Sequence, residues 1–246
     1  MKTCLLSSCN SNTMTPLTKL LTFHPFIMKL LLTSSGLTNQ SIANALFDLM
    51  GKKPEDATVV FIPTASNVET GDKSWLITDL IHLQNQKFQS IEITDISAVD
   101  ASIWRPSLER ADVLIFEGGN SYHLMRWLNK SGLAGWLPEL LKDKVYVGIS
   151  AGSMVTNPDL ASKLSQEIYE EDQLETEELT GLNLVDFYFL PHLNSEWFPK
   201  VRRENIEQAA QRIGKTIYVC DDRTALKIVD GQIRVVGDGE WFVIEK

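Results

Sequence analysis

The chain has 246 residues, of which 43% are hydrophobic and 22% are charged, and its formal net charge is −9. This composition is ordinary for a protein with a sizeable core, and the negative charge argues against nucleic acid or an anionic membrane surface as the main partner. The three cysteines, Cys4, Cys9 and Cys220, form no disulfide framework or zinc pattern, so we expect a reduced, cytoplasmic chain.

The predicted elements begin near residue 28. Residues 1–27 are rich in Ser, Thr and Asn without a regular period, and we expect a loose extension rather than a targeting signal. From residue 28 to 246 we expect a single α/β domain, in which β-rich runs alternate with helix-like runs. The predicted strands cover residues 29–34, 57–63, 90–95, 111–117, 144–150, 185–191 and 216–221, and the predicted helices cover 39–51, 72–86, 121–130, 134–143 and 199–213.

This alternation predicts a mostly parallel sheet with helices on both faces. The chain after residue 223 contains three further short β-rich runs, separated by Asp230-Gly231 and by Asp238-Gly239. Asp-Gly between such runs is a strong hairpin signal, so we expect an antiparallel hairpin to close the domain. The acidic stretch 157–180 has no clean period, and we expect it to contain a loop near the functional site.

One serine stands out by its surroundings. The segment "GISAGS" places Ser150 between Gly148 and Gly152, directly after the predicted strand 144–150. This spacing is typical of a nucleophile held on a strained turn between a strand and a helix. A second glycine motif, "EGGN" at 117–120, ends the strand 111–117. Its glycines let the backbone approach a ligand and expose N–H groups at the same edge of the sheet.

A serine nucleophile needs a base, usually histidine. Of the four histidines, His192 directly follows a predicted strand and is favoured over His123, which follows the "EGGN" turn. A carboxylate that orients the histidine would complete the set. The segment between Ser150 and His192 holds nine Asp and Glu residues, and the residue pattern alone does not choose among them.

Four motifs together resemble a known family: "EGGN", "GISAGS", "LVDFYFLPHL" at 184–193 and "DDRTALKIVDG" at 221–231. In this order they are similar to the dipeptidase E and cyanophycinase family of serine peptidases, over about residues 28–246, and most similar to its dipeptidase E-like bacterial subgroup. The resemblance implies a sandwich related to class I glutamine amidotransferases, with serine in place of their cysteine.

The resemblance also implies roles for particular residues. Ser150 would be the nucleophile and His192 the base, while the N–H groups of Ala151 and of Gly119 or Gly118 would form the oxyanion hole. The family's acid follows the serine at a short distance, which implies Glu167, with Glu170 and Asp172 as competitors.

The resemblance further implies a dipeptidase or exopeptidase that cleaves short peptides with an acidic first residue. An acidic side chain that enters a water-poor site needs a cation. The basic residues near the predicted site are Lys200, Arg202, Arg203 and Arg223. We expect Asn120 and Arg203 to contact the substrate.

Two other functions compete with this interpretation. An α/β-hydrolase esterase shares the serine motif and the order of its residues, but the stretch from Ser150 to His192 is short for that fold and no HGGG-like motif precedes it. A non-enzymatic relative that binds a peptide or metabolite is the second alternative. No metal or organic cofactor is expected, the expected partner is a short peptide, and a homodimer is the assembly to test.

Overall fold

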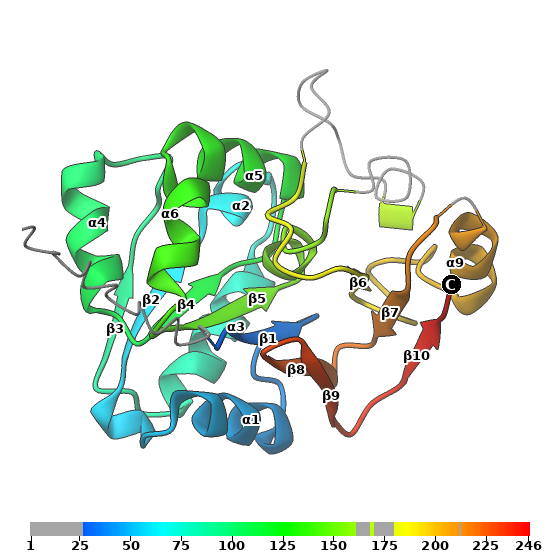
Figure 1. Ribbon diagram of the computed structural model, residues 1–246, viewed down its shortest axis with the longest axis horizontal. Helices are drawn as coiled ribbons and strands as arrows, with labels where there is room; N and C mark the ends of the chain where they lie inside the picture. The colour runs from blue at the N-terminus through cyan, green and yellow to red at the C-terminus, as the bar shows by residue number, and fades with distance from the viewer. Residues whose placement is uncertain (1–26, 161–167, 170–179, 212) are drawn as a thin grey trace, which may run out of the picture.

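The computed structural model describes residues 27–160, 168–169, 180–211 and 213–246. These residues form a seven-stranded sheet and a smaller three-stranded sheet, which lie side by side (Figure 1). Almost all of the extension predicted for residues 1–27, and most of the predicted loop region 157–180, lie outside the described residues.

The large sheet confirms the predicted α/β class. Its strand order is β3-β2-β4-β5-β1-β8-β9. The first five strands in this order run parallel, and β8 and β9 add an antiparallel hairpin that turns at Asp230-Gly231, as predicted. The bounds are β1 (Lys29–Thr33), β2 (Thr58–Ile62), β3 (Ser90–Ile93), β4 (Val113–Phe116), β5 (Val145–Ile149), β8 (Thr224–Val229) and β9 (Gln232–Gly237).

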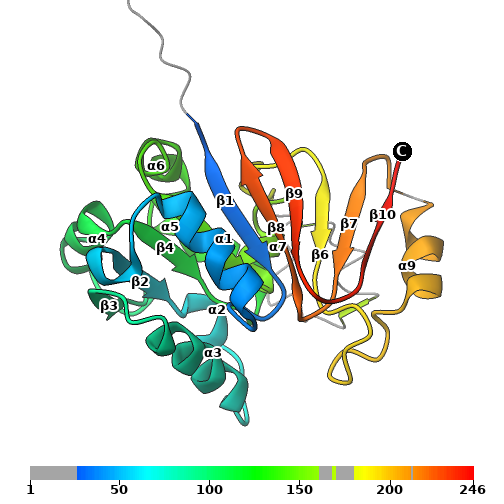
Figure 2. The ribbon, with the colours of Figure 1, turned by 90° about the horizontal axis from the view of Figure 1, so that it is seen from below.

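Helices cover both faces of the large sheet (Figures 1 and 2). Alternate residues of a strand point to opposite faces, so Leu114 and Phe116 of β4 join one apolar cluster and Val113 and Ile115 join the other. The first cluster packs against α4 (Ala101–Arg110), α5 (Ser121–Lys130) and α6 (Leu133–Leu140), and the second against α1 (Gln40–Met50) and α3 (Ser74–Asn85).

Shorter elements fill the connections: η1 (Pro54–Asp56), α2 (Thr64–Asn67) and α7 (Ala151–Met154). Helix α4 is absent from the sequence-based prediction. It contains Pro106, which disfavours a helix interior, but Trp104 and Leu108 are buried in the core and the side chain of Asp100 caps its start. Tertiary packing therefore outweighs the local signal. No helix in the described part of the chain is long and apolar enough to span a membrane.

The small sheet has the order β10-β7-β6, with bounds β6 (Tyr188–Leu190), β7 (Ile217–Cys220) and β10 (Trp241–Ile244). Strands β6 and β7 are parallel, and β10 pairs with β7 in the antiparallel sense. Helix α9 (Arg203–Ala210) buries Ile206 and Ala209 against this sheet. The third C-terminal strand thus leaves the hairpin and joins a second sheet that the sequence pattern does not predict.

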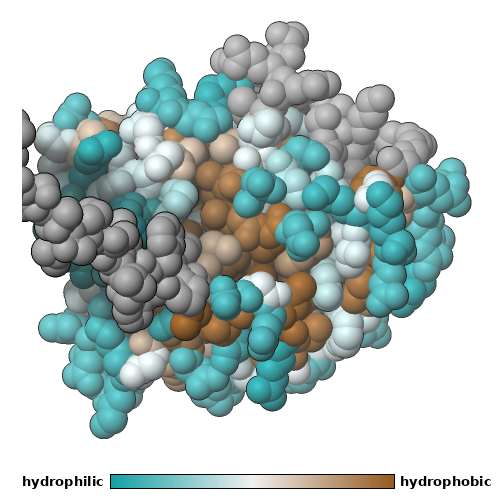
Figure 3. All heavy atoms as spheres, in the orientation of Figure 1, coloured by the Kyte–Doolittle hydropathy of each residue, from teal (hydrophilic) through white to brown (hydrophobic). Residues whose placement is uncertain are grey.

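The loop after β1 connects the carboxyl ends of the two sheets. Its Ser34 hydroxyl donates to the carbonyl of Cys220 (3.1 Å) and accepts the backbone N–H of His192 (3.2 Å). Thr38 donates to the carbonyl of Asp222 (2.8 Å). Because β1 is the neighbour of β5, this loop fixes the ends of β6 and β7 next to the end of β5. Hydrophobic side chains gather near the centre of the surface in this view (Figure 3).

Candidate active site

Ser150 lies on a strained turn between β5 and α7. Its φ is 49° and its ψ is −110°, a backbone conformation that costs free energy in any residue other than glycine. The turn is held by the Ser150 N–H, which donates to the carbonyl of Thr33 (3.0 Å), and by Ser153, whose hydroxyl donates to the same carbonyl (2.8 Å). At Gly152 any Cβ would collide with the carbonyl of Phe116, which explains the glycine after the serine.

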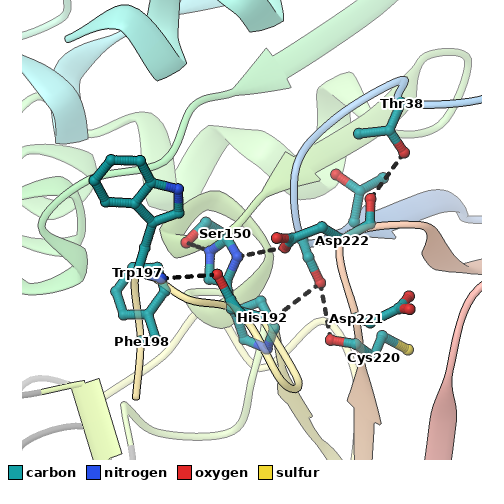
Figure 4. Close-up of polar contacts among 12 residues, drawn as sticks. Thr38, Ser150, His192, Trp197, Phe198, Cys220, Asp221 and Asp222 are labelled. Atoms are coloured by element: carbon teal, nitrogen blue, oxygen red, sulfur yellow. Dashed lines mark hydrogen bonds and ion pairs between the residues drawn. The ribbon is translucent and has the colours of Figure 1, made fainter. Parts of the chain in front are cut away.

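Ser150, His192 and Asp222 form a continuous chain of hydrogen bonds (Figure 4). The Nε2 atom of His192 lies 2.8 Å from the Oγ of Ser150, and its Nδ1 lies 2.6 Å from the Oδ1 of Asp222. His192 has a φ of 67°, and its ring is stacked on Phe198 with 4.5 Å between the centroids. The imidazole is therefore fixed on three sides, with Nε2 directed at the serine hydroxyl.

Asp222 remains ionised in this arrangement. Burial alone would raise the pKa of its carboxyl, but the hydrogen bond and charge of His192, together with a hydrogen bond from Ser35, bring the pKa below its ordinary value. An ionised carboxylate at Nδ1 favours the tautomer with its proton on that atom. Nε2 is then free to accept a proton from Ser150.

Two sheets contribute to this chain of residues. Ser150 directly follows β5 of the large sheet, whereas His192 and Asp222 each follow a strand of the small sheet by two residues. Since β6 and β7 are parallel neighbours, the residues after them lie at the same edge. The pairing of β6 with β7 therefore places His192 and Asp222 next to each other at the edge that faces Ser150.

Asp222 is not among the sequence-based candidates, all of which lie between Ser150 and His192. A signal was present: Asp222 follows the predicted strand 216–221, at the sheet edge where ligands bind. The predicted acid Glu167 and its competitors Glu170 and Asp172 lie outside the described residues, so their roles stay predictions.

Gly119 and Ala151, the predicted oxyanion donors, lie on either side of the serine in the fold. Ala151 is the first residue of α7, and Gly118 packs against Ser150, where a Cβ would lie 3.2 Å from the serine Cβ. Gly119 has a φ of 123°, and a side chain there would collide with the carbonyl of Ala65. Among the described residues, neither amide donates to another group.

Other predicted residues have structural contacts. The side chain of Asn120 caps α5 by accepting the N–H of His123 (2.8 Å). His123 is partly buried, and its pKa is lowered by burial and by the charge of Arg126, against the opposing charge of Asp95. The histidine beside Ser150 is His192.

The predicted substrate cation Arg203 lies on α9 against the small sheet. It pairs with Glu207 (3.2 Å), and its guanidinium lies over the ring of Phe242 (3.9 Å). Arg223 pairs with Asp238 (2.5 Å). Arg202 donates to the carbonyls of Ser195, Phe198 and Val201, and so holds the loop after His192 in shape.

A pair of acidic residues lies beneath the serine. Glu117 precedes Gly118 and is fully buried. Burial and the negative charge of Asp79 on α3 raise the pKa of Glu117. Burial is also the largest cause that raises the pKa of Asp79, to about 7, and the charge of Asp222 adds to it. In the described part of the chain, no group of three His, Cys, Asp or Glu residues is arranged to hold a metal.

Comparison with known proteins gives a consistent result. The sequence model of peptidase family S51 matches residues 30–236. An uncharacterised peptidase of Listeria monocytogenes is 29% identical over 74% of this chain and 87% of its own length. Peptidase E of Escherichia coli is 23% identical over 85% of this chain and 86% of its own length.

Solved structures show the same fold. The crystal structure of a Listeria monocytogenes protein described as a candidate peptidase E superposes with a TM-score of 0.69 at 25% identity, and covers 87% of this chain and all of that one. A peptidase from an acI-B1 actinobacterium superposes with a TM-score of 0.65 at 19% identity, over 89% of this chain and 92% of that one.

Proposed function

The chain belongs to peptidase family S51, and from that premise we propose that it cleaves short peptides through an acyl-enzyme formed on Ser150. The single observation that carries the proposal is the hydrogen-bonded chain from Ser150 through His192 to Asp222, with distances of 2.8 and 2.6 Å. A serine on a strained turn, a base in contact with it and a carboxylate that orients the base are the parts that acyl transfer requires.

The proposed reaction has two halves. In the first, the Oγ of Ser150 attacks the peptide carbonyl while Nε2 of His192 takes the hydroxyl proton. The amine leaves with that proton, and the acyl group stays on the serine. In the second, water attacks the ester and gives its proton to His192, which returns it to the Oγ of Ser150 as the ester bond breaks and the acid leaves. Asp222 stabilises the imidazolium in both halves, and the amides of Gly119 and Ala151 donate to the oxyanion.

The acid of the relay is Asp222 in this proposal. It occupies the Nδ1 side of His192 at 2.6 Å, and its lowered pKa keeps it charged. In this proposal Asp222 takes the role that the resemblance alone implies for Glu167. A carboxylate from the segment around Glu167 would have to displace a contact that Asp222 already makes.

The proposed substrate is a short peptide, and a preference for an acidic first residue rests on the resemblance to dipeptidase E. Its test uses the peptide itself, since Arg203 is engaged with Glu207 and Phe242. We expect Asp-Leu to be hydrolysed faster than Ala-Leu. Equal rates would remove the acidic preference and leave the peptidase.

The experiment that tests the proposal compares Ser150→Ala with wild type. The alanine variant should lose several orders of magnitude in kcat on dipeptides, because only binding and the oxyanion hole remain. It should also fail to take up a fluorophosphonate that labels wild type. More than a tenth of wild-type activity in Ser150→Ala would contradict the assignment.

Ser150 and His192 should act as a unit in catalysis. Ser150→Ala combined with His192→Ala should cost little more than either change alone, since members of one relay are not additive. His123→Ala is the matched control, because it removes a histidine that competes by sequence but lies away from the serine hydroxyl. A larger loss from His123→Ala than from His192→Ala would refute the role of His192.

A further inference from the structure

Trp197 is 87% exposed, far more than the other exposed tryptophans, Trp241 at 47% and Trp75 at 38%. Tryptophan is on average a highly buried residue. Trp197 precedes Phe198, whose ring is stacked on that of His192 with 4.5 Å between the centroids. Figure 4 draws Trp197 next to the Ser150–His192 pair, from the same loop as Phe198. A large apolar surface thus faces solvent beside the proposed reaction centre.

The loop that carries Trp197 is built rigidly. The backbone N–H of Trp197 donates to the hydroxyl of Ser195 (3.3 Å). The guanidinium of Arg202 donates to three carbonyls of the same loop at 2.9–3.1 Å. The backbone of Asn194 donates to the carbonyl of Val201, which is fully buried. The indole is therefore presented from a fixed support, and a ligand would not have to pay for ordering the loop.

The proton transfer from His192 to the leaving amine indicates which part of a substrate lies beside Trp197. The leaving amine receives its proton from Nε2 of the base, so the nitrogen of the scissile bond must lie close to His192. The residue that follows that nitrogen extends away from the serine on the histidine side. Phe198 occupies one face of the imidazole, and Trp197 is the residue immediately before Phe198 in the loop.

We propose that Trp197 forms an apolar wall of the subsite that receives the residue after the scissile bond. This inference rests on the proposed function and adds a substrate class to it: peptides whose second residue is aromatic or a large aliphatic. An indole offers such a side chain a broad apolar surface and an aromatic partner for stacking. Glycine at the second position would leave that surface exposed to water.

The first test compares kcat/KM on Ala-Phe, Ala-Leu and Ala-Gly for four proteins: wild type, Trp197→Ala, Trp197→Phe and Trp241→Ala. Trp197→Ala should lower kcat/KM on Ala-Phe by about ten-fold or more, equivalent to about 1.4 kcal/mol, and leave Ala-Gly within about two-fold. Trp197→Phe should recover much of the loss. Trp241→Ala, the matched control on β10, should behave as wild type.

Unchanged discrimination between Ala-Phe and Ala-Gly in Trp197→Ala would overturn the inference. An equal loss on all three peptides would overturn it too, because it would mean that the change had disturbed His192. So would a change in oligomeric state by gel filtration with no change in selectivity, since that would make the indole a contact between copies of the chain.

A second test does not require turnover. In the Ser150→Ala protein, intact Ala-Phe should bind more tightly than Ala-Gly in a calorimetric titration, and addition of Trp197→Ala should abolish the difference. Equal affinities in the Ser150→Ala protein would refute the subsite. Failure of the proposed function has a different signature, namely that wild type neither hydrolyses dipeptides nor takes up the fluorophosphonate, whatever the binding preference.

Discussion

Two sets of acidic residues lie near Ser150: Asp222 is one, and Asp79 with Glu117 is the other. Their pKa values shift in opposite directions. Asp222 has a hydrogen-bonding partner in His192. This contact outweighs the cost of burial, and the pKa of Asp222 falls. Glu117 is instead fully buried beside Asp79, and the pKa values of both rise. Burial alone therefore favours the neutral acid, whereas burial beside the hydrogen-bonding His192 favours the carboxylate.

The largest expected effect separates the two groups by activity. Asp222→Asn should lower kcat by roughly 10⁴, since an amide at Nδ1 favours the wrong tautomer of the base. Kinetics on a dipeptide measures the loss. Asp221→Asn is the matched control, because its carboxylate accepts the N–H groups of Arg223 and Glu240 and makes no contact with His192 in the described structure.

The same assay settles the competing acids. Glu167→Gln, Glu170→Gln and Asp172→Asn should each stay within a few-fold of wild type. If one of them lost roughly 10⁴ in kcat while Asp222→Asn did not, the acid of the relay would lie in that segment.

The second prediction concerns stability and pH. The folded protein keeps a proton on Asp79 up to a pKa of about 7, while the unfolded chain loses it near 3.8. Between these values the folded state binds more protons, so its stability falls as the pH rises. Asp79→Asn should remove this fall. Relative to wild type, its Tm should be unchanged near pH 4 and higher by at least about 2 °C at pH 8.

Asp112 provides the control with the opposite sign. Burial would raise the pKa of its carboxyl, but hydrogen bonds from Lys52 and Thr58 lower it. Asp112→Asn should therefore be destabilising at pH 8, with the loss shrinking at acidic pH below the ordinary pKa. A Tm difference for Asp79→Asn that shrank as the pH rose would contradict the assignment of a raised pKa.

The smallest expected effect tests whether the buried acids act as a pair. Since Asp79 raises the pKa of Glu117, while a hydrogen bond with Glu117 lowers the pKa of Asp79, the effects of Asp79→Asn and Glu117→Gln on the free energy of unfolding in urea at pH 8 should not be additive. A coupling free energy of about 0.5–3 kcal/mol is expected. Additivity within about 0.5 kcal/mol would show two independent acids. Glu117→Gln should keep dipeptidase activity within a few-fold, in contrast to Asp222→Asn.

Much of the fold follows from the sequence pattern. The seven strands predicted before residue 222 are present, and the apolar runs of β4 and β5 indicated a sheet covered on both faces, as found. Helix α4 escaped because Pro106 masks its periodicity. The second sheet is not predicted from the sequence, because strand pairing depends on contacts between residues far apart in the chain. Strands β6, β7 and β10 look like ordinary β-rich runs, and their local sequence does not indicate which strand each one pairs with.

By itself, the sequence determined which serine and which histidine are the candidates for the site, Ser150 and His192, because local motifs mark both. Ser150 required flanking glycines, because a side chain at Gly152 would collide with Phe116 and one at Gly148 with the backbone of Ser153. His192 directly followed a β-rich run. Only the tertiary structure decided which carboxylate contacts Nδ1 of His192. Asp222 is 30 residues beyond His192, and it reaches Nδ1 because β6 and β7 are parallel neighbours whose carboxyl ends meet. A turn is specified by the residues within it, whereas a contact between strand ends depends on which strands pair.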